Sequence, residues 1–235
     1  MKIKAVLFDL DGTLLPMDQD EFVKAYFKLL AARMVPKGYE PRELVECIWT
    51  GTKAMIKNNG SCRNEEAFWR CFEEKYGEEA MKDKPYIDAF YTGDFEKAKV
   101  SCGFNKEAAE VIHELQENDV PIILATNPIF PAAATEKRMR WAGLEPEDFL
   151  LYTTYENSHY CKPNPKYYQE ILKKTGFQPE ECLMVGNDVQ EDMVAATLGM
   201  KVFLLTDCLI NKEGRDISVF PHGGFAQLKE YLHFL

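Results

Sequence analysis

Two aspartates stand two positions apart near the start of this 235-residue chain and have the spacing of a carboxylate pair. Asp9 and Asp11 follow a short apolar run at residues 5–8, and Gly12 and Thr13 come directly after them. Two carboxylates held together suit a hard cation such as Mg²⁺, which prefers oxygen ligands. They equally suit a nucleophile beside a general acid–base group, because a negative charge raises the pKa of a neighbouring acid. An ordinary turn would also explain Asp-x-Asp-Gly taken alone.

Three more groups of polar residues stand at the ends of later apolar runs or just before a predicted helix. They are Thr126 and Asn127, then Lys162, then Asn187 and Asp188 followed by Asp192. Taken singly, each has a plain explanation as turn chemistry, an exposed lysine, or a helix cap with a first-turn acid. Turn chemistry does not explain their order, which is carboxylate pair, hydroxyl, lysine and second carboxylate pair. We therefore expect one site at one edge of a sheet, where parallel α/β folds usually bind ligands.

Short, continuously apolar runs predict the strands that would position these groups. They lie at residues 5–8, 120–126, 182–185 and 201–205, with a shorter strand at 149–152. Continuous rather than alternating apolarity is typical of strands buried on both faces of a parallel sheet. Amphipathic helices are expected after Asn105 as a cap, over 131–143, over 165–176 and over 191–198. The pattern predicts an α/β fold with a parallel sheet and crossover helices.

The segment from residue 14 to residue 103 has helical stripes but no convincing strand. Asp18 is a candidate cap for a helix that includes residues 22–30, and further stripes lie at 44–56 and, after Asn64, at 67–72. Three or four helices predict a small helical subdomain. We expect residues 1–13 and 104–235 to form the α/β core domain and residues 14–103 to form the inserted subdomain. Residues 82–85 and 101–103 are the expected hinges.

The composition is that of an ordinary globular protein, with 46% hydrophobic and 28% charged residues. A formal charge of -10 repels polyanions over most of the surface, so neither nucleic acid nor an anionic membrane is an expected partner. Asp9 ends the first apolar run too early for a signal peptide or a membrane span, so a cytoplasmic location is expected. The protein is expected to be a monomer or a homodimer. The seven cysteines include no Cys-x-x-Cys pair and are expected to be reduced and structural. A nucleophilic Cys161 is the alternative.

The polar groups resemble the four motifs of the haloacid dehalogenase superfamily of phosphohydrolases. The matching segments are Asp9-Leu10-Asp11-Gly12-Thr13-Leu14, Thr126-Asn127, Lys162-Pro163-Asn164-Pro165 and Gly186-Asn187-Asp188-Val189-Gln190-Glu191-Asp192. The resemblance implies a Rossmann-like core. Because the helical insertion lies between the first and second motifs, it also implies a helical cap of the kind found in phosphoglycolate phosphatase and β-phosphoglucomutase relatives.

The resemblance also implies roles for these residues. Asp9 would be the nucleophile that forms an aspartyl-phosphate, and Asp11 would protonate the leaving oxygen and afterwards activate water. Lys162, Thr126 and Asn127 would hold the phosphoryl group together with backbone N–H groups. Mg²⁺ would bind Asp9, the main-chain carbonyl of Asp11 and an aspartate of the fourth motif.

The fourth motif departs from the family pattern, because Asn187 stands where many relatives have the metal-binding aspartate. The spacing from Gly186 to Asp192 favours Asn187 as the equivalent position, whereas charge favours Asp188. We expect Asp188 to be the direct ligand. Asn187 and Asp192 are expected in the outer shell, where Asp192 would hydrogen-bond a metal-bound water or Lys162.

Together these features predict a Mg²⁺-dependent phosphatase that acts on a small phosphorylated metabolite, with the cap closing over the site. A phosphomutase of the same family and a non-catalytic phosphate-binding regulator are the alternatives. The resemblance implies that a dehalogenase would not have Asp11, and that a phosphonatase would need a cap lysine, for which Lys53 and Lys57 are candidates. Cap side chains are expected to set specificity, although core packing is the better expectation for Trp49 and Trp69.

Overall fold

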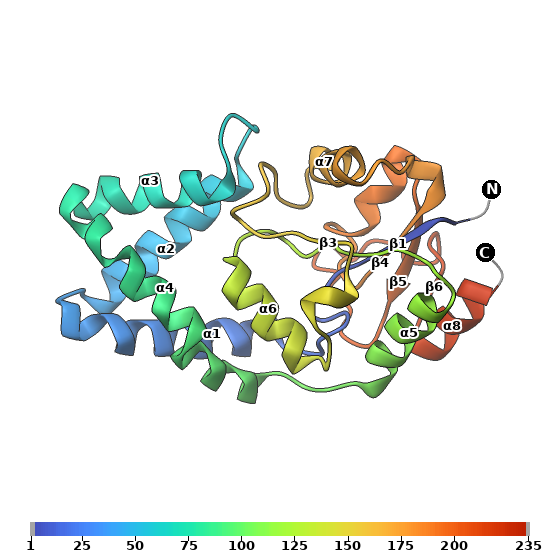
Figure 1. The fold of residues 1–235 in the computed structure, drawn as a ribbon, viewed down its shortest axis with the longest axis horizontal. Coiled ribbons are helices and arrows are strands. Elements are labelled where there is room, and N and C mark those ends of the chain that lie inside the picture. The colour runs from blue at the N-terminus through green and yellow to red at the C-terminus, as the bar shows by residue number, and fades with distance from the viewer. Residues whose placement is uncertain (1–2, 234–235) are drawn as a thin grey trace.

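The computed structural model describes residues 3–233 and contains one six-stranded parallel sheet. The strands are β1 (Ala5–Phe8), β2 (Ile122–Leu124), β3 (Leu151–Tyr152), β4 (Cys182–Gly186), β5 (Lys201–Leu205) and β6 (His222–Gly223). Figure 1 shows this sheet. The spatial order of its strands is β3-β2-β1-β4-β5-β6, so β1 lies between β2 and β4. In register, Val6 of β1 is opposite Ile122 of β2 and Leu183 of β4. The predicted α/β fold with a parallel sheet is confirmed.

Helices cover both faces of the sheet, which explains why its strands are continuously apolar. Ala5 and Leu7 of β1 belong to a core that includes α7 (Pro165–Thr175) and the 3₁₀ helix η6 (Met193–Leu198). Val6 and Phe8 belong to the core of the opposite face, which α5, α6 and α8 cover. These three helices are α5 (Lys106–Glu117), α6 (Ala132–Trp141) and α8 (Phe225–His233). Two short 3₁₀ helices, η4 (Pro146–Asp148) and η5 (Pro179–Glu181), precede β3 and β4.

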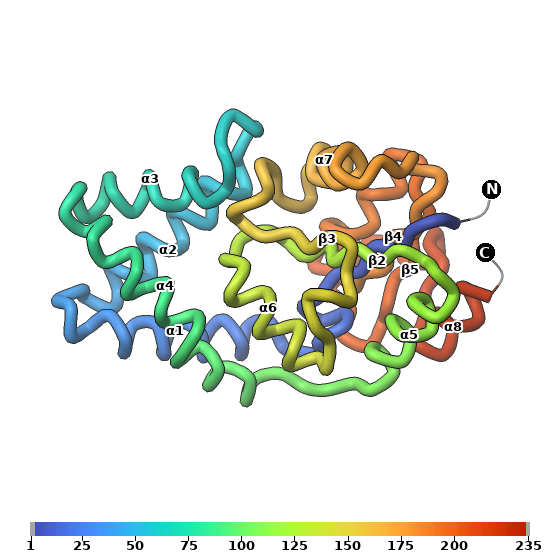
Figure 2. The backbone as a smooth tube through the Cα atoms, in the orientation of Figure 1, coloured from blue at the N-terminus to red at the C-terminus, as the bar shows by residue number. Residues whose placement is uncertain are grey.

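The chain between β1 and β2 forms a group of helices beside the sheet, which we call the cap (Figure 2). The cap comprises α1 (Gln19–Met34), η1 (Val35–Lys37), α2 (Pro41–Ile56), α3 (Asn64–Tyr76), η2 (Glu78–Asp83), α4 (Lys84–Thr92) and η3 (Asp94–Ser101). The outgoing and returning chains meet at the base of the cap, where Met17 pairs antiparallel with Cys102 and the N–H of Gly103 donates to the carbonyl of Pro16 at 2.7 Å. The insertion of a helical region between the first two strands is confirmed.

Local signals in the sequence explain where several helices begin and end. The Asp18 side chain accepts hydrogen bonds from the backbone N–H groups of Asp20 and Glu21, and Asn105 accepts one from Glu107, so both residues are N-caps as predicted. Gly176 has a φ of 81° and ends α7 in the left-handed conformation that favours glycine. None of the helices within residues 3–233 is long and apolar enough to cross a membrane.

The structure corrects three predictions about local structure and adds one strand. The predicted helix at 191–198 is the 3₁₀ helix η6, which begins only at Met193, because residues 188–192 form a turn held by the Asp188 side chain. Residues 82–85 are not a linker but the junction of η2 and α4. Asn64 does not precede α3 but is its first residue, and its side chain is fully buried. The sequence analysis also missed β6, which is only two residues long.

Candidate active site

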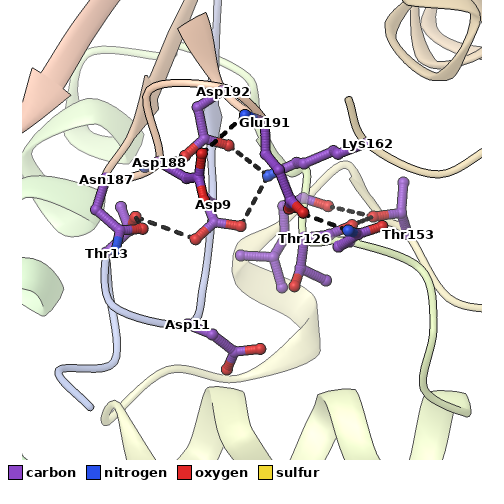
Figure 3. A network of polar contacts seen from close by, with 12 residues as sticks. Asp9, Asp11, Thr13, Thr126, Thr153, Lys162, Asn187, Asp188, Glu191 and Asp192 are labelled. Atoms are coloured by element: carbon purple, nitrogen blue, oxygen red, sulfur yellow. Dashed lines mark hydrogen bonds and ion pairs between the residues drawn. The ribbon is translucent and has the colours of Figure 1, made fainter. Parts of the chain in front are cut away.

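A cavity of about 150 Å³ lies where β1, β2 and β4 end, beside α1 of the cap. The residues that line it include Asp9, Asp11, Thr126, Asn127, Asn187, Asp188 and Asp192, all of which the sequence singled out. Lys162 reaches the same cluster through its contacts with Asp9 and Asp192 (Figure 3). Residues that are up to 183 positions apart in the sequence thus meet at one edge of the sheet, because parallel strands place their carboxyl ends together.

Lys162 joins two aspartates in a buried ion-pair network (Figure 3). Its Nζ donates to Asp9 Oδ1 at 2.8 Å and to Asp192 Oδ1 at 2.6 Å, and its side chain is 1% exposed. Burial opposes the positive charge, but the carboxylates of Asp192 and Asp9 outweigh burial and hold the pKa of Lys162 well above its ordinary value. The two carboxylates therefore favour the charged ammonium form of Lys162, which lies beside Asp9 and Asp192.

Further hydrogen bonds orient the two carboxylates that Lys162 joins. The Thr13 hydroxyl donates to Asp9 Oδ2 at 3.1 Å, and the backbone N–H of Asp188 donates to Asp192 Oδ2 at 2.9 Å. Burial raises the pKa of Asp192, whereas the Lys162 ammonium lowers it. Gly186 makes room for this arrangement, because a Cβ atom at that position would lie 2.1 Å from Asp192 Oδ2.

Asp11 is not paired with Asp9; its side chain turns away from the network towards α6 (Figure 3). Asp11 Oδ2 accepts a hydrogen bond from Nη1 of Arg138, while Asp11 Oδ1 is buried without a hydrogen-bond partner in the described structure. Burial raises the pKa of Asp11, and the Arg138 guanidinium lowers it. The second carboxylate of the pair is thus held by an arginine that lies 127 positions away.

Arg138 was not predicted as a site residue. Its side chain is fully buried. Its Nε donates to the Ala134 carbonyl at 3.3 Å, and its guanidinium carbon lies 4.5 Å from the centre of the Phe130 ring. A signal was present, because Arg138 shares the buried side of α6 with Ala134 and Trp141, which are four and three positions away. A charged residue on such a stripe indicates a buried partner of opposite charge.

The fourth motif contributes two side chains, Asn187 and Asp188, that differ in whether a side-chain oxygen remains without a hydrogen bond. Both ends of the Asn187 amide have polar neighbours, because Oδ1 lies 3.0 Å from the Thr13 hydroxyl, whose single proton is shared between Asn187 Oδ1 and Asp9 Oδ2, and Nδ2 donates to the Cys208 carbonyl at 2.7 Å. Asp188 accepts from the N–H groups of Gln190 and Glu191 through Oδ1 alone. None of the hydrogen bonds in the described part of the chain uses its Oδ2. Asp188 therefore has a free carboxylate oxygen at the cavity, and Asn187 has none.

Glu191 and the residues that follow β2 complete the wall of the cavity. Asn127 Nδ2 donates to Glu191 Oε2 at 3.0 Å, and Asn127 Oδ1 is buried without a partner among the described residues. Burial raises the pKa of Glu191 to about 7, against the lowering effect of Lys162. The backbone carbonyl of Thr126 accepts hydrogen bonds from Thr153 Oγ1 at 2.6 Å and from the Tyr167 hydroxyl at 2.8 Å. These two hydrogen bonds fix the backbone at Thr126, which lines the cavity.

The donor atoms around the cavity fit a hard cation. Within residues 3–233, no three His, Cys, Asp or Glu side chains are arranged to hold a metal ion by themselves. Asp9 and Asp188 nevertheless supply two carboxylates at the cavity, and the unpartnered Oδ1 atoms of Asp11 and Asn127 are also oxygens. A set of oxygen donors with few side-chain ligands is typical of Mg²⁺ sites, which retain several waters. Asp9 and Asp188 are the side chains that could hold such an ion.

Other candidates from the sequence lie away from this chemistry. Cys161 is 1% exposed, burial raises its pKa, and all seven cysteines are free thiols. The pKa shift opposes a role as a nucleophile. Lys53 and Lys57 are exposed and do not line the cavity that contains Asp9. The expectation of core packing is wrong for Trp49, which is 44% exposed, whereas Trp69 is 6% exposed and buried as expected.

Known proteins resemble this chain over most of its length. A family model described as haloacid dehalogenase-like hydrolase matches residues 3–198. Glyceraldehyde 3-phosphate phosphatase of Methanothermobacter thermautotrophicus is 28% identical over 240 residues, covering 98% of this chain and 100% of that protein. Pyrophosphatase PpaX of Halalkalibacterium halodurans is 23% identical over 201 residues, covering 86% of this chain and 82% of that protein.

Two solved structures share the fold at low sequence identity. A protein described as a predicted phosphoglycolate phosphatase from Haemophilus somnus has a TM-score of 0.59 at 16% identity and covers 98% of each chain. The HAD-hydrolase YfnB of Bacillus subtilis, described as bound to magnesium, has a TM-score of 0.57 at 17% identity and covers 99% of each chain. At these identities the likeness concerns the fold alone.

Proposed function

We propose that this chain, which belongs to the haloacid dehalogenase-like hydrolases, is a Mg²⁺-dependent phosphatase that hydrolyses a small phosphorylated metabolite through an aspartyl-phosphate. One observation carries the proposal: a single cavity holds an aspartate that is bonded to a buried lysine, with a second carboxylate two residues further along the chain. These are Asp9, Lys162 and Asp11. Of the curated relatives named above, one is a phosphatase and one a pyrophosphatase, and both names describe hydrolysis of a phosphate ester or anhydride, which supports the same class of chemistry.

In the proposed first step, a carboxylate oxygen of Asp9 attacks phosphorus and the ester P–O bond breaks. The leaving oxygen takes a proton from Asp11, which lines the cavity and whose carboxyl group must first release its bond to Arg138. In the second step Asp11 accepts a proton from water while the water oxygen attacks the phosphorus. This releases inorganic phosphate and restores the Asp9 carboxylate.

Electrostatic stabilisation has to supply most of the acceleration, because general acid–base catalysis contributes only about 10²- to 10⁴-fold. Lys162 provides a fixed positive charge next to Asp9, and its bond to Asp192 keeps it there. The Thr126 hydroxyl and the Asn127 amide line the same cavity and are assigned to the phosphoryl oxygens. When bound, Mg²⁺ supplies a second positive charge that offsets the charge of the phosphoryl group.

We assign the metal to Asp9, the main-chain carbonyl of Asp11 and Asp188, with Asn187 and Asp192 in the outer shell. The free oxygen of Asp188 and the fully bonded amide of Asn187 support this choice. Asp188→Asn should raise the Mg²⁺ concentration required for half-maximal activity, whereas Asp192→Asn should chiefly lower stability. If Asp192→Asn changes the Mg²⁺ requirement and Asp188→Asn does not, the assignment is reversed.

The activity is tested with an aryl phosphate, Mg²⁺ and the variant Asp9→Asn. The variant should lose turnover almost completely, because an amide cannot act as the nucleophile. The exposed Asp216→Asn serves as the matched control and should retain full activity. Substantial activity in Asp9→Asn would refute the proposed nucleophile. Free phosphate released from a sugar phosphate, instead of an isomer, would distinguish hydrolysis from a phosphomutase reaction, and failure to hydrolyse any phosphate ester would favour a non-catalytic regulator.

A further inference from the structure

A second cavity, of about 70 Å³, lies between the cap and the loops that follow β2 and β3. We call it the aromatic cavity, because nine of the fifteen residues that line it are aromatic and none is charged. The cap contributes residues of α1 to α4, and the other side of the cavity includes Phe130 and Tyr155. Trp49 lies at its exposed side and Trp69 within it. Such a cavity favours an apolar ligand.

The aromatic cavity adjoins the cavity of about 150 Å³ that contains Asp9, which we call the catalytic cavity. Val23 of α1, together with Ile129 and Phe130 of the loop after β2, lines both. A molecule with its phosphate at Asp9 therefore has these three apolar side chains beside the rest of its structure. A cavity of about 150 Å³ holds a benzene molecule. The aromatic cavity, at about 70 Å³, is too small for a whole ring, and the catalytic cavity, at about 150 Å³, must also hold the phosphate, so a ring has to lie across both cavities.

Most polar groups of the aromatic cavity are already bonded to one another or to the backbone; the indole N–H of Trp49, at the exposed side, has no hydrogen bond among the described residues. The hydroxyls of Tyr26 and Tyr91 lie 2.9 Å apart in a mutual hydrogen bond. Trp69 Nε1 donates to the Tyr155 hydroxyl at 3.3 Å, and the Thr52 hydroxyl donates to a backbone carbonyl of its own helix at 2.9 Å. A polyhydroxylated group that entered would lose hydrogen bonds to water and regain few of them.

The catalytic cavity also disfavours a second phosphate. The charged residues among those that line it are all acidic: Asp9, Asp11, Asp188, Glu191 and Asp192. The two nearby cations, Lys162 and Arg138, are each bonded to these carboxylates. Among the described residues that line either cavity, no lysine or arginine remains for a second anionic group. A diphosphate would therefore place extra negative charge among carboxylates.

We propose that the substrate is a phosphate monoester whose leaving group is uncharged and apolar, with a short hydrocarbon chain or an aromatic ring that extends from the catalytic cavity past Val23, Ile129 and Phe130 into the aromatic cavity. The inference rests on the proposed phosphatase activity and narrows it to one class of substrate. It separates this chain from the pyrophosphatases among its relatives. Each methylene that enters the cavity should raise kcat/KM about fourfold, as expected from the transfer of one methylene out of water.

The test compares alkyl and benzyl phosphates with glycerol phosphate, a hexose phosphate and pyrophosphate, all with Mg²⁺. Benzyl phosphate should exceed methyl phosphate at least about tenfold in kcat/KM, and pyrophosphate should be the poorest substrate. Trp49→Ala should reduce the ratio of benzyl to methyl phosphate. Thr52→Lys should reduce this ratio and raise the activity towards pyrophosphate, because it places a cation in the aromatic cavity. Thr50→Lys changes an exposed threonine of the same helix and should leave the ratio unchanged.

Binding provides a readout that does not need turnover. Benzylphosphonate should bind at least tenfold more tightly than methylphosphonate to the wild-type protein, and this preference should decrease in Trp49→Ala. If the protein hydrolyses phosphate esters but prefers the hexose phosphate or pyrophosphate, the substrate class is wrong and the phosphatase proposal stands. If the binding preference holds without any hydrolysis, the phosphatase proposal fails and the apolar site stands. Equal binding of both phosphonates refutes the inference.

Discussion

Lys162 provides the sharpest test of the network at the candidate active site. Replacement by methionine keeps a long apolar stem and removes the ammonium that bonds Asp9 and Asp192. Side-chain exposures are 1% for Lys162, 10% for Asp9 and 1% for Asp192, so the variant leaves two facing carboxylates that water hardly reaches. Breaking a buried ion pair by removing one partner costs about 3–5 kcal/mol. A protein of ordinary stability, about 5–15 kcal/mol, could lose much of its free energy of unfolding.

Most of this cost should arise at Asp192. Asp9 keeps the Thr13 hydroxyl and some contact with the cavity, whereas Asp192 keeps only the N–H of Asp188 and is almost inaccessible. Lys162→Met combined with Asp192→Asn should therefore recover most of the lost free energy of unfolding. The exposed Lys166→Met is the matched control and should change stability by less than about 0.5 kcal/mol.

The cost should also depend on pH in a defined direction. Burial already raises the pKa of Asp192, and the removal of Lys162 removes the main opposing influence, so the folded-state pKa rises further. A group whose folded-state pKa is raised stabilises the protein at pH values below its unfolded-state pKa, and this stabilisation is lost as pH increases through the folded-state pKa. The deficit of Lys162→Met relative to the wild type should thus be smallest in mild acid and should grow towards pH 8.

Urea denaturation followed by tryptophan fluorescence measures these differences, with the free energy of unfolding extrapolated at pH 5, 6, 7 and 8. A loss below about 1 kcal/mol for Lys162→Met would refute the reasoning. So would a double variant no more stable than Lys162→Met, or a deficit that shrinks as pH rises.

Two further changes test neighbouring contacts. Arg138→Met removes the partner of Asp11 and should lower the free energy of unfolding by about 3 kcal/mol, the lower end of the range because the Asp11 side chain is 21% exposed. Since Arg138 lowers the pKa of Asp11, the variant should shift the pH–rate profile of aryl phosphate hydrolysis to higher pH, and an unchanged profile would separate Arg138 from the acid. Gly186→Ala would place a Cβ atom 2.1 Å from Asp192 Oδ2 and should cost about 1–3 kcal/mol by displacing that carboxylate, whereas Gly224→Ala makes only ordinary contacts and should be nearly neutral in urea denaturation.

The strands and most of the helices followed from local patterns. The apolar run at 5–8 and the caps at Asp18 and Asn105 are short-range signals, and the structure bears them out. The failures have different causes. Residues 191–192 are not helical because the turn before η6 is held by Asp188 and by the contact between Asp192 and Lys162. A two-residue strand such as β6 has no periodicity that a sequence pattern could detect.

The polar residues of the candidate site were predictable as a set because a parallel sheet gathers the ends of its strands at one edge. Their mutual contacts were not. Asp9 and Asp11 form a pair in the sequence, yet Lys162 bonds one and Arg138 bonds the other. The choice between Asn187 and Asp188 as the side chain with a free oxygen depends on the hydroxyl of Thr13, which lies 174 positions away from Asn187.

The sequence by itself determined the α/β architecture, the inserted helices and the identity of the residues at the sheet edge, because these depend on periodicity, capping and chain order. Only the tertiary structure decided which charges pair, that Trp49 stays exposed, and that an uncharged aromatic cavity adjoins the catalytic cavity. The physical reason is that ion pairing and cavity lining depend on distances between distant segments. The periodicity and capping that indicate helices and strands depend mainly on residues close together in the sequence.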